Sequence, residues 1–126
     1  MTVNEHVVIF AVPSWGHVRS LVALACRIIQ QKPDVGITIL TAGDIIKKVE
    51  AEVVRYFSPG GESKNNIRII SVLEPSPDIF GIIVQTAGAC MNFYQTISRE
   101  ERVTCLVSGK TFEPWRKPTL VISDVS

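Results

Sequence analysis

"HVVIFAVPSWGHVRS", residues 6–20, joins a continuous apolar run to the start of an amphipathic segment through a short turn. The run from His6 to Val12 is rich in β-branched residues, which is typical of a strand buried on both faces. From Val18 to Gln31 apolar residues recur at steps of three or four, which predicts a helix that ends before Pro33. Strand, turn and helix in this order predict the opening unit of a parallel α/β fold.

The rest of the chain repeats this alternation. Further strands are expected at 35–42, 67–73 and 119–123, and loops at 58–66 and 110–118. Asp44 can cap a second helix, with one apolar face made of Ile45, Ile46, Val49, Val53 and Val54. A third helical stretch follows a break at 74–78, with apolar residues at Phe80, Ile83, Val84, Ala87, Met91 and Tyr94. Residues 103–108 fit either helix or strand.

This alternation predicts a Rossmann-like, doubly wound parallel sheet of about four strands, with helices on both faces. Right-handed crossovers favour the strand order 3-2-1-4. The interval 74–118 is long for one crossover, so we expect it to hold extra helices that line a pocket.

Composition excludes several classes of function. The chain has 126 residues, is 46% hydrophobic and 20% charged, and carries a formal net charge of +1, so it offers no footprint for nucleic acid or an anionic membrane. No apolar stretch approaches the ~20 residues of a membrane span, and the N-terminal run lacks a basic region before it. Cys26, Cys90 and Cys105 have no metal-ligand spacing. We expect a cytoplasmic protein with buried cysteines, no metal site and no transmembrane segment.

The turn "PSWGH", residues 13–17, does not suit a phosphate. It has one glycine, whereas a dinucleotide site needs Gly-x-Gly-x-x-Gly, and no Gly-Lys-Ser/Thr follows a glycine-rich loop. A rigid turn that ends in an imidazole is better suited to presenting that side chain to a small ligand. His6, at the other end of the strand, is expected to be structural, because ligands bind beyond the carboxyl ends of strands.

His17 and Asp124 follow the first and fourth strands, so the predicted strand order brings both to one crevice. A neutral imidazole can take a proton from a substrate hydroxyl, and a carboxylate behind it fixes the tautomer and stabilises the imidazolium. Two structural alternatives stay open. The histidine can cap or pack at the helix start, and the aspartate can cap a following helix.

The same residues resemble a known family. "HVVIFAVPSWGHVRSLVALACRII" is similar to the opening of the UDP-dependent glycosyltransferases of the GT-B fold, whose first strand ends in a Pro-x-x-Gly-His turn. "PTLVISD" resembles the strand that ends in their second catalytic residue. The resemblance implies that His17 is the base, that Asp124 is its carboxylate partner, and that the acceptor hydroxyl displaces UDP with inversion. It also implies an acceptor site at Ser14, Trp15, Gly16 and Phe80, although Trp15 can equally be a packing residue.

Two departures from the family matter. Ser20 stands where the family usually has proline. The chain also supplies four predicted strands where such a sheet has about six, and nothing in it resembles the donor domain's His-Cys-Gly-Trp-Asn-Ser segment.

We therefore expect residues 1–126 to be the N-terminal part of the acceptor-binding domain, without the C-terminal UDP-sugar domain. The full enzyme would transfer a hexose to a hydroxyl of a small lipophilic acceptor, with UDP-sugar as donor substrate and no other cofactor. This chain alone would be inactive. Two alternatives stay open: the acceptor half of a split transferase with a separate donor-domain partner, and a non-catalytic Rossmann-like binding module.

Overall fold

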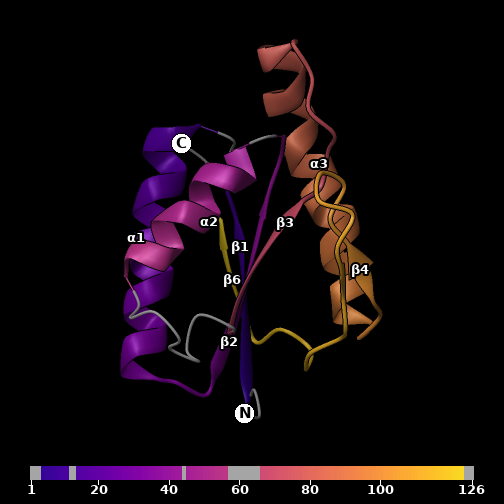
Figure 1. Ribbon diagram of the computed structural model, residues 1–126. Coiled ribbons are helices and arrows are strands. Elements are labelled where there is room, and N and C mark those ends of the chain that lie inside the picture. Colours follow the sequence, from indigo (N-terminus) through magenta and orange to yellow (C-terminus); the bar gives the residue numbers. More distant parts are fainter. Residues whose placement is uncertain (1–3, 12–13, 44, 57–65, 124–126) are drawn as a thin grey trace.

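A computed structural model describes residues 4–11, 14–43, 45–56 and 66–123, which form a parallel sheet with helices on both faces (Figure 1). The sheet has four strands in the order β3-β2-β1-β6, so the predicted order is confirmed, with β6 as the predicted fourth strand. The elements, in chain order, are β1 (Glu5–Phe10), α1 (Trp15–Gln31), β2 (Val35–Thr41), α2 (Ile45–Arg55), β3 (Ile67–Ser71), α3 (Ile79–Ser98), β4 (Val103–Thr104), β5 (Thr111–Phe112) and β6 (Leu120–Ser123).

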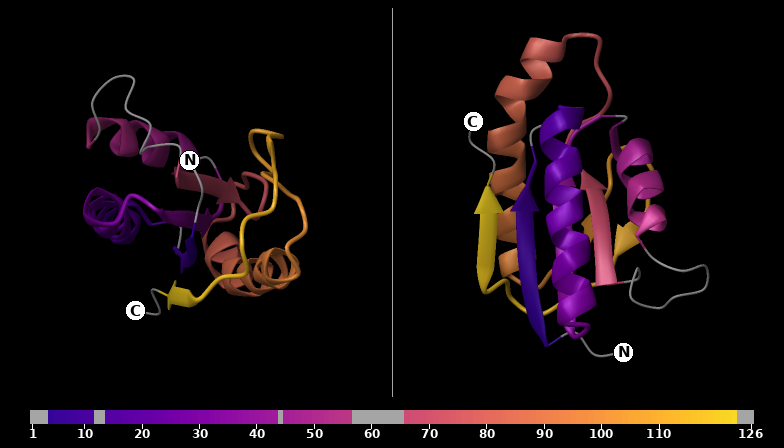
Figure 2. Two further views of the ribbon diagram at one scale, coloured as in Figure 1. Left: turned by 90° about the horizontal axis from the view of Figure 1, so that it is seen from below. Right: turned by 90° about the vertical axis from the view of Figure 1, so that its left-hand side faces the viewer.

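The two faces of the sheet carry separate apolar cores. Helices α1 and α2 cover one face and α3 covers the other, as both views in Figure 2 show. Strand β2 is buried along its whole length because it lies inside the sheet and under helices on both sides. Alternate residues of β1 therefore enter different cores: Val7 and Ile9 pack under α1 and α2, and Val8 packs under α3.

The apolar face expected for the third helix is wrong except at Tyr94. Phe80 and Val84 are 81% and 78% exposed, and Ile83 and Met91 are exposed as well. Of the expected set, Tyr94 is half-buried and packs against this core, and the fully buried residues of α3 are Thr86, Cys90 and Ile97. Apolar residues lie on several sides of this helix, so periodicity did not identify the packed side, and the position of the sheet decided it.

The interval 74–118 also differs from expectation. In place of extra helices it holds α3 and a short antiparallel pair, β4 with β5. The ambiguous segment at 103–108 is therefore a strand followed by a turn, and the predicted loop at 110–118 contains β5.

Helix α2 differs in one residue of its predicted face. Val54 is 58% exposed, whereas Ile46, Val49 and Val53 are buried. A carboxylate shares the buried side instead: Glu52 pairs with Arg55 at 3.0 Å and with Arg19 of α1 at 3.5 Å. The expected cap Asp44 lies outside the described residues.

The three cysteines are free and buried, as expected. Burial raises the pKa of Cys26 to about 11 and that of Cys90 to about 12. Within the described part of the chain, no helix combines the length and the apolar character that a membrane crossing requires.

His6 is buried in β1 and holds three segments together. Its Nδ1 is 2.8 Å from the carbonyl oxygen of Arg116, and its Nε2 is 2.6 Å from Oγ1 of Thr38. The ring of Trp115 meets the imidazole edge to face at 5.2 Å between centroids. Burial lowers the pKa of His6 to about 4; the bond to the Arg116 carbonyl opposes this shift, and the charge of Arg68 adds to it. The contacts agree with the structural role expected for His6.

The depressed pKa of His6 predicts a stability that falls on acidification. The folded state holds His6 neutral down to about pH 4, whereas the unfolded chain binds a proton near pH 6.5, so stability is lost as pH falls from about 6.5 to 4. The loss from this group should reach about 3 kcal/mol, measured as the free energy of unfolding in urea between pH 7 and pH 4. His6→Asn should flatten the slope between pH 6.5 and 5, and His17→Asn should not. An equal slope in all three proteins would contradict the assignment.

Candidate functional site

A pocket of about 570 Å³ lies where β1 and β6 end. Its lining comes from the N-cap and first turns of α1 and from the last residue of β6: Ser14, Gly16, His17, Ser20, Leu21 and Ser123. Ser123 pairs with Phe10, the last residue of β1, so the two strand ends lie side by side. Strands β2 and β3 follow β1 on one side and β6 lies on the other, so the strand order reverses at this pocket. In open α/β sheets this is the usual position of a ligand.

The local backbone fixes His17 in the first turn of α1. Ser14 is the N-cap, with extended φ and ψ of −120° and 122°, and its carbonyl oxygen accepts the N–H of Val18 at 3.0 Å. This first helical bond sets the orientation of the turn that carries His17, which is exposed to solvent. The Ser20 hydroxyl donates to the Gly16 carbonyl at 3.4 Å and so stays on the helix.

His17 is the one titratable group among the described residues that line this pocket. Three serine side chains, Ser14, Ser20 and Ser123, surround the site with hydroxyl groups, and Leu21 adds an apolar wall. Such a site can exchange a proton with a hydroxyl-bearing ligand. Among the described residues, no group of three histidine, cysteine or acidic side chains could hold a metal ion.

The structure brings together three of the predicted site residues, Ser14, Gly16 and His17, and separates two. Trp15 packs against the core under α1 and α2, with Nζ of Lys48 6.0 Å from its ring centre, and it does not line the pocket. Phe80 lies on α3, largely exposed, and does not line it either. Asp124 directly follows Ser123 in the sequence and lies outside the described residues, so its role stays a prediction.

Three lining residues were not predicted as part of the site. Ser20 and Leu21 stand three and four residues after His17, the spacing that puts helical side chains on one face. Ser123 immediately precedes Asp124. Helical spacing from His17 is thus a signal that could have found the first two.

No family model, no curated protein and no solved structure matches this chain. The function is therefore inferred from the site itself and from the sequence resemblance.

Gly16 allows a direct test of the first turn. A Cβ built on Gly16 would meet no atom within 4 Å outside its chain neighbours and its own helix backbone, and the residue is helical, so Gly16→Ala should raise the free energy of unfolding by about 0.5 kcal/mol. Gly43→Ala is the matched control, because Gly43 has a φ of 72° and alanine there should destabilise the fold. Both are measured by urea denaturation. A lower free energy of unfolding for Gly16→Ala would contradict this prediction and would show that the backbone at residue 16 requires glycine.

Proposed function

We propose that this chain supplies the acceptor-binding and proton-accepting half of an inverting UDP-sugar-dependent glycosyltransferase. The observation that supports this best is the position of His17, which lines a pocket at the point where the strand order reverses. The turn that carries it, Pro13 to His17, is also the segment that resembles this enzyme family most clearly.

In the proposed reaction the imidazole of His17 accepts the proton of an acceptor hydroxyl. The hydroxyl oxygen forms a bond to the anomeric carbon of the sugar, and the bond from that carbon to the UDP oxygen breaks, so that UDP leaves with the electron pair. Attack opposite the leaving group inverts the anomeric configuration. Asp124 is the proposed partner that stabilises the imidazolium.

The pocket suits a small acceptor rather than a nucleotide. Leu21 contributes an apolar surface, and the serine hydroxyls can orient the acceptor's reacting oxygen. No lysine or arginine lines this pocket among the described residues, so the phosphates of UDP would be held by another domain.

The test uses the chain alone and joined to a donor-binding domain of a UDP-sugar transferase. The chain alone should release no UDP from UDP-glucose with a lipophilic phenol such as 2-naphthol as acceptor. The joined form should release UDP, and His17→Ala should lower kcat/KM by about 10²–10⁴-fold, because the base is lost. Arg27→Ala, an exposed change further along α1, is the control and should leave turnover unchanged. Turnover by the chain alone, or full activity in His17→Ala, would refute the proposal.

The edge of β6 favours a second candidate, in which the donor domain is a separate polypeptide. Leu120 and Val121 of this edge strand are 52% and 38% exposed, which leaves an apolar edge open to a partner. Co-purification of the tagged chain with a protein that binds UDP-sugar would favour this arrangement, and recovery of the chain alone would exclude it.

A further inference from the structure

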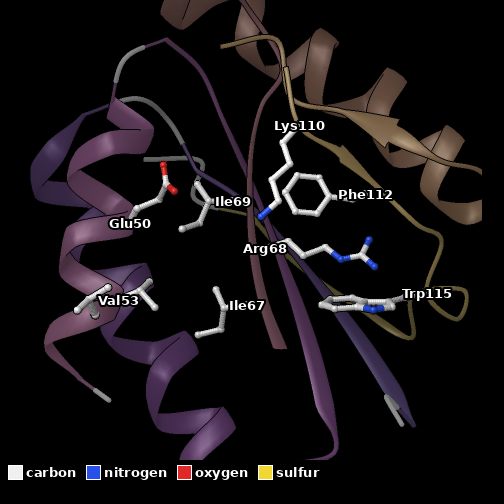
Figure 3. Close-up of a pocket in the computed structure, with 9 residues that line it drawn as sticks. Glu50, Val53, Ile67, Arg68, Ile69, Lys110, Phe112 and Trp115 are labelled. Carbon is white, nitrogen blue, oxygen red and sulfur yellow. The ribbon is translucent and has the colours of Figure 1, made fainter. Parts of the chain in front are cut away.

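A second pocket, of about 540 Å³, lies along the outer edge of β3, at the opposite edge of the sheet from β6 (Figure 3). Its base is the strand itself, from Ile67 to Ile69. One wall comes from α2 and the other from the segment that contains β5. The pocket therefore spans both faces of the sheet around a single exposed strand edge.

The main-chain groups of this edge can be assigned from neighbouring bonds. Val72 donates its N–H to Thr41 of β2, and the Ser71 carbonyl accepts the N–H of Leu106 on the other side. The main-chain N–H and C=O groups of successive residues in a strand point to alternate sides. Ser71 points away from β2, so Ile69 and Ile67 also direct their N–H and C=O groups away from β2. No described residue makes a hydrogen bond to these outward groups of Ile67 or Ile69.

The chain already places a segment beside β3 at one end of this edge. Leu106 donates to the Ser71 carbonyl at 3.0 Å, and the Ser71 N–H donates to Sγ of Cys105 at 3.2 Å. A strand that extends this line toward Ile67 would lie in the pocket and would meet four main-chain groups, an N–H and a C=O from each isoleucine.

The two walls differ in chemistry. On the α2 side, Val53 and Val54 give an apolar surface, with Glu50 also on the lining. On the other side lie two aromatic rings and two cations: Phe112, Trp115, Arg68 and Lys110 (Figure 3).

Arg68 is fixed in that second wall. Its guanidinium stacks over Trp115, with Cζ 3.4 Å from the ring centroid, and donates to the Glu113 carbonyl at 2.5 Å. Lys110 has its Nζ 5.3 Å from the Phe112 ring, and no acidic partner is found for it among the described residues. The charge of Glu113, which also pairs with Arg102, acts on Arg68, so Lys110 is where this wall favours an acidic side chain.

We propose that the β3 edge binds an extended peptide segment of a partner protein by strand addition, and that the segment alternates apolar and acidic residues. Side chains of an added strand alternate between the two walls, so apolar residues would face Val53 and Val54 and acidic ones would face Lys110. Pairing with a second copy of this chain is disfavoured. If the β3 edges of two copies paired antiparallel about a two-fold axis, equivalent faces of the two sheets would lie on the same side. The cations of both copies would then lie close together and repel.

The probe is the peptide acetyl-EVEVEV-amide, titrated into ¹⁵N-labelled protein. The amides of Ile67 and Ile69 should shift and become protected from hydrogen exchange. The charge-reversed peptide acetyl-KVKVKV-amide should bind at least tenfold more weakly. Unchanged Ile67 and Ile69 amides at millimolar acetyl-EVEVEV-amide would overturn the proposal.

Main-chain pairing is tested by methylating the peptide nitrogens. In an added strand the N–H groups of either the valines or the glutamates face β3, because both alternations have a period of two. Methylation of one set should therefore weaken binding at least tenfold, and methylation of the other set should not. Strand addition would be overturned if the two methylated peptides bound with equal affinity, or if neither of them bound.

Three protein variants complete the test. Ile69→Pro removes an outward N–H without removing a bond to β2, so affinity should fall at least fivefold, whereas Ile69→Val should bind like the parent. Should Ile69→Pro fail to fold, Lys110→Glu decides the question, because it should erase or reverse the preference for the acidic peptide. A preference unchanged in Lys110→Glu would overturn the assigned charge role. Protection of Ile67 and Ile69 that rises with protein concentration, with no response to peptide, would overturn the proposal in favour of self-pairing.

Discussion

The pairing of β1 on both of its edges is the constraint on which the rest of the structure depends. Val7 faces Ile37 of β2 on one edge and Leu120 of β6 on the other, and the same double pairing continues to Phe10. Because all three strands are parallel, their carboxyl ends meet at one side of the sheet. This places the turn that carries His17 beside Ser123, although the two residues come from opposite ends of the sequence.

Strand β6 is held beside β1 by contacts at the other end of the strands, near the amino end of β1. Trp115 stacks on Arg68 of β3 and meets His6 of β1, and the carbonyl of Arg116 lies against the His6 imidazole. The N–H of Thr119 then bonds to the His6 carbonyl, one residue before β6 begins. One buried histidine thus connects the segment that builds the wall of the β3 pocket to the strand that completes the His17 pocket.

The two pockets use different properties of the same sheet. At the ends of β1 and β6, side chains such as His17 and Ser123 line the pocket, which suits chemistry on a small molecule. At the β3 edge, main-chain groups of Ile67 and Ile69 face outward between an apolar wall and a cationic wall, which suits an extended chain. The first proposal depends on a titratable side chain, and the second on backbone pairing and charge.

The sequence by itself determined the strand order and the place of His17, because a β-branched run, a turn and a helical period are local patterns, and right-handed crossovers then leave few arrangements. Ser14 and Gly16, the other predicted residues that line the pocket, are neighbours of His17 in the chain. Only the tertiary structure decided which side of α3 is buried, since apolar residues lie on several sides of that helix and the sheet selects Cys90 and Ile97 over Phe80. It also decided that Trp15 packs inward and that residues 110–116 lie against β3, because these contacts join segments far apart in sequence.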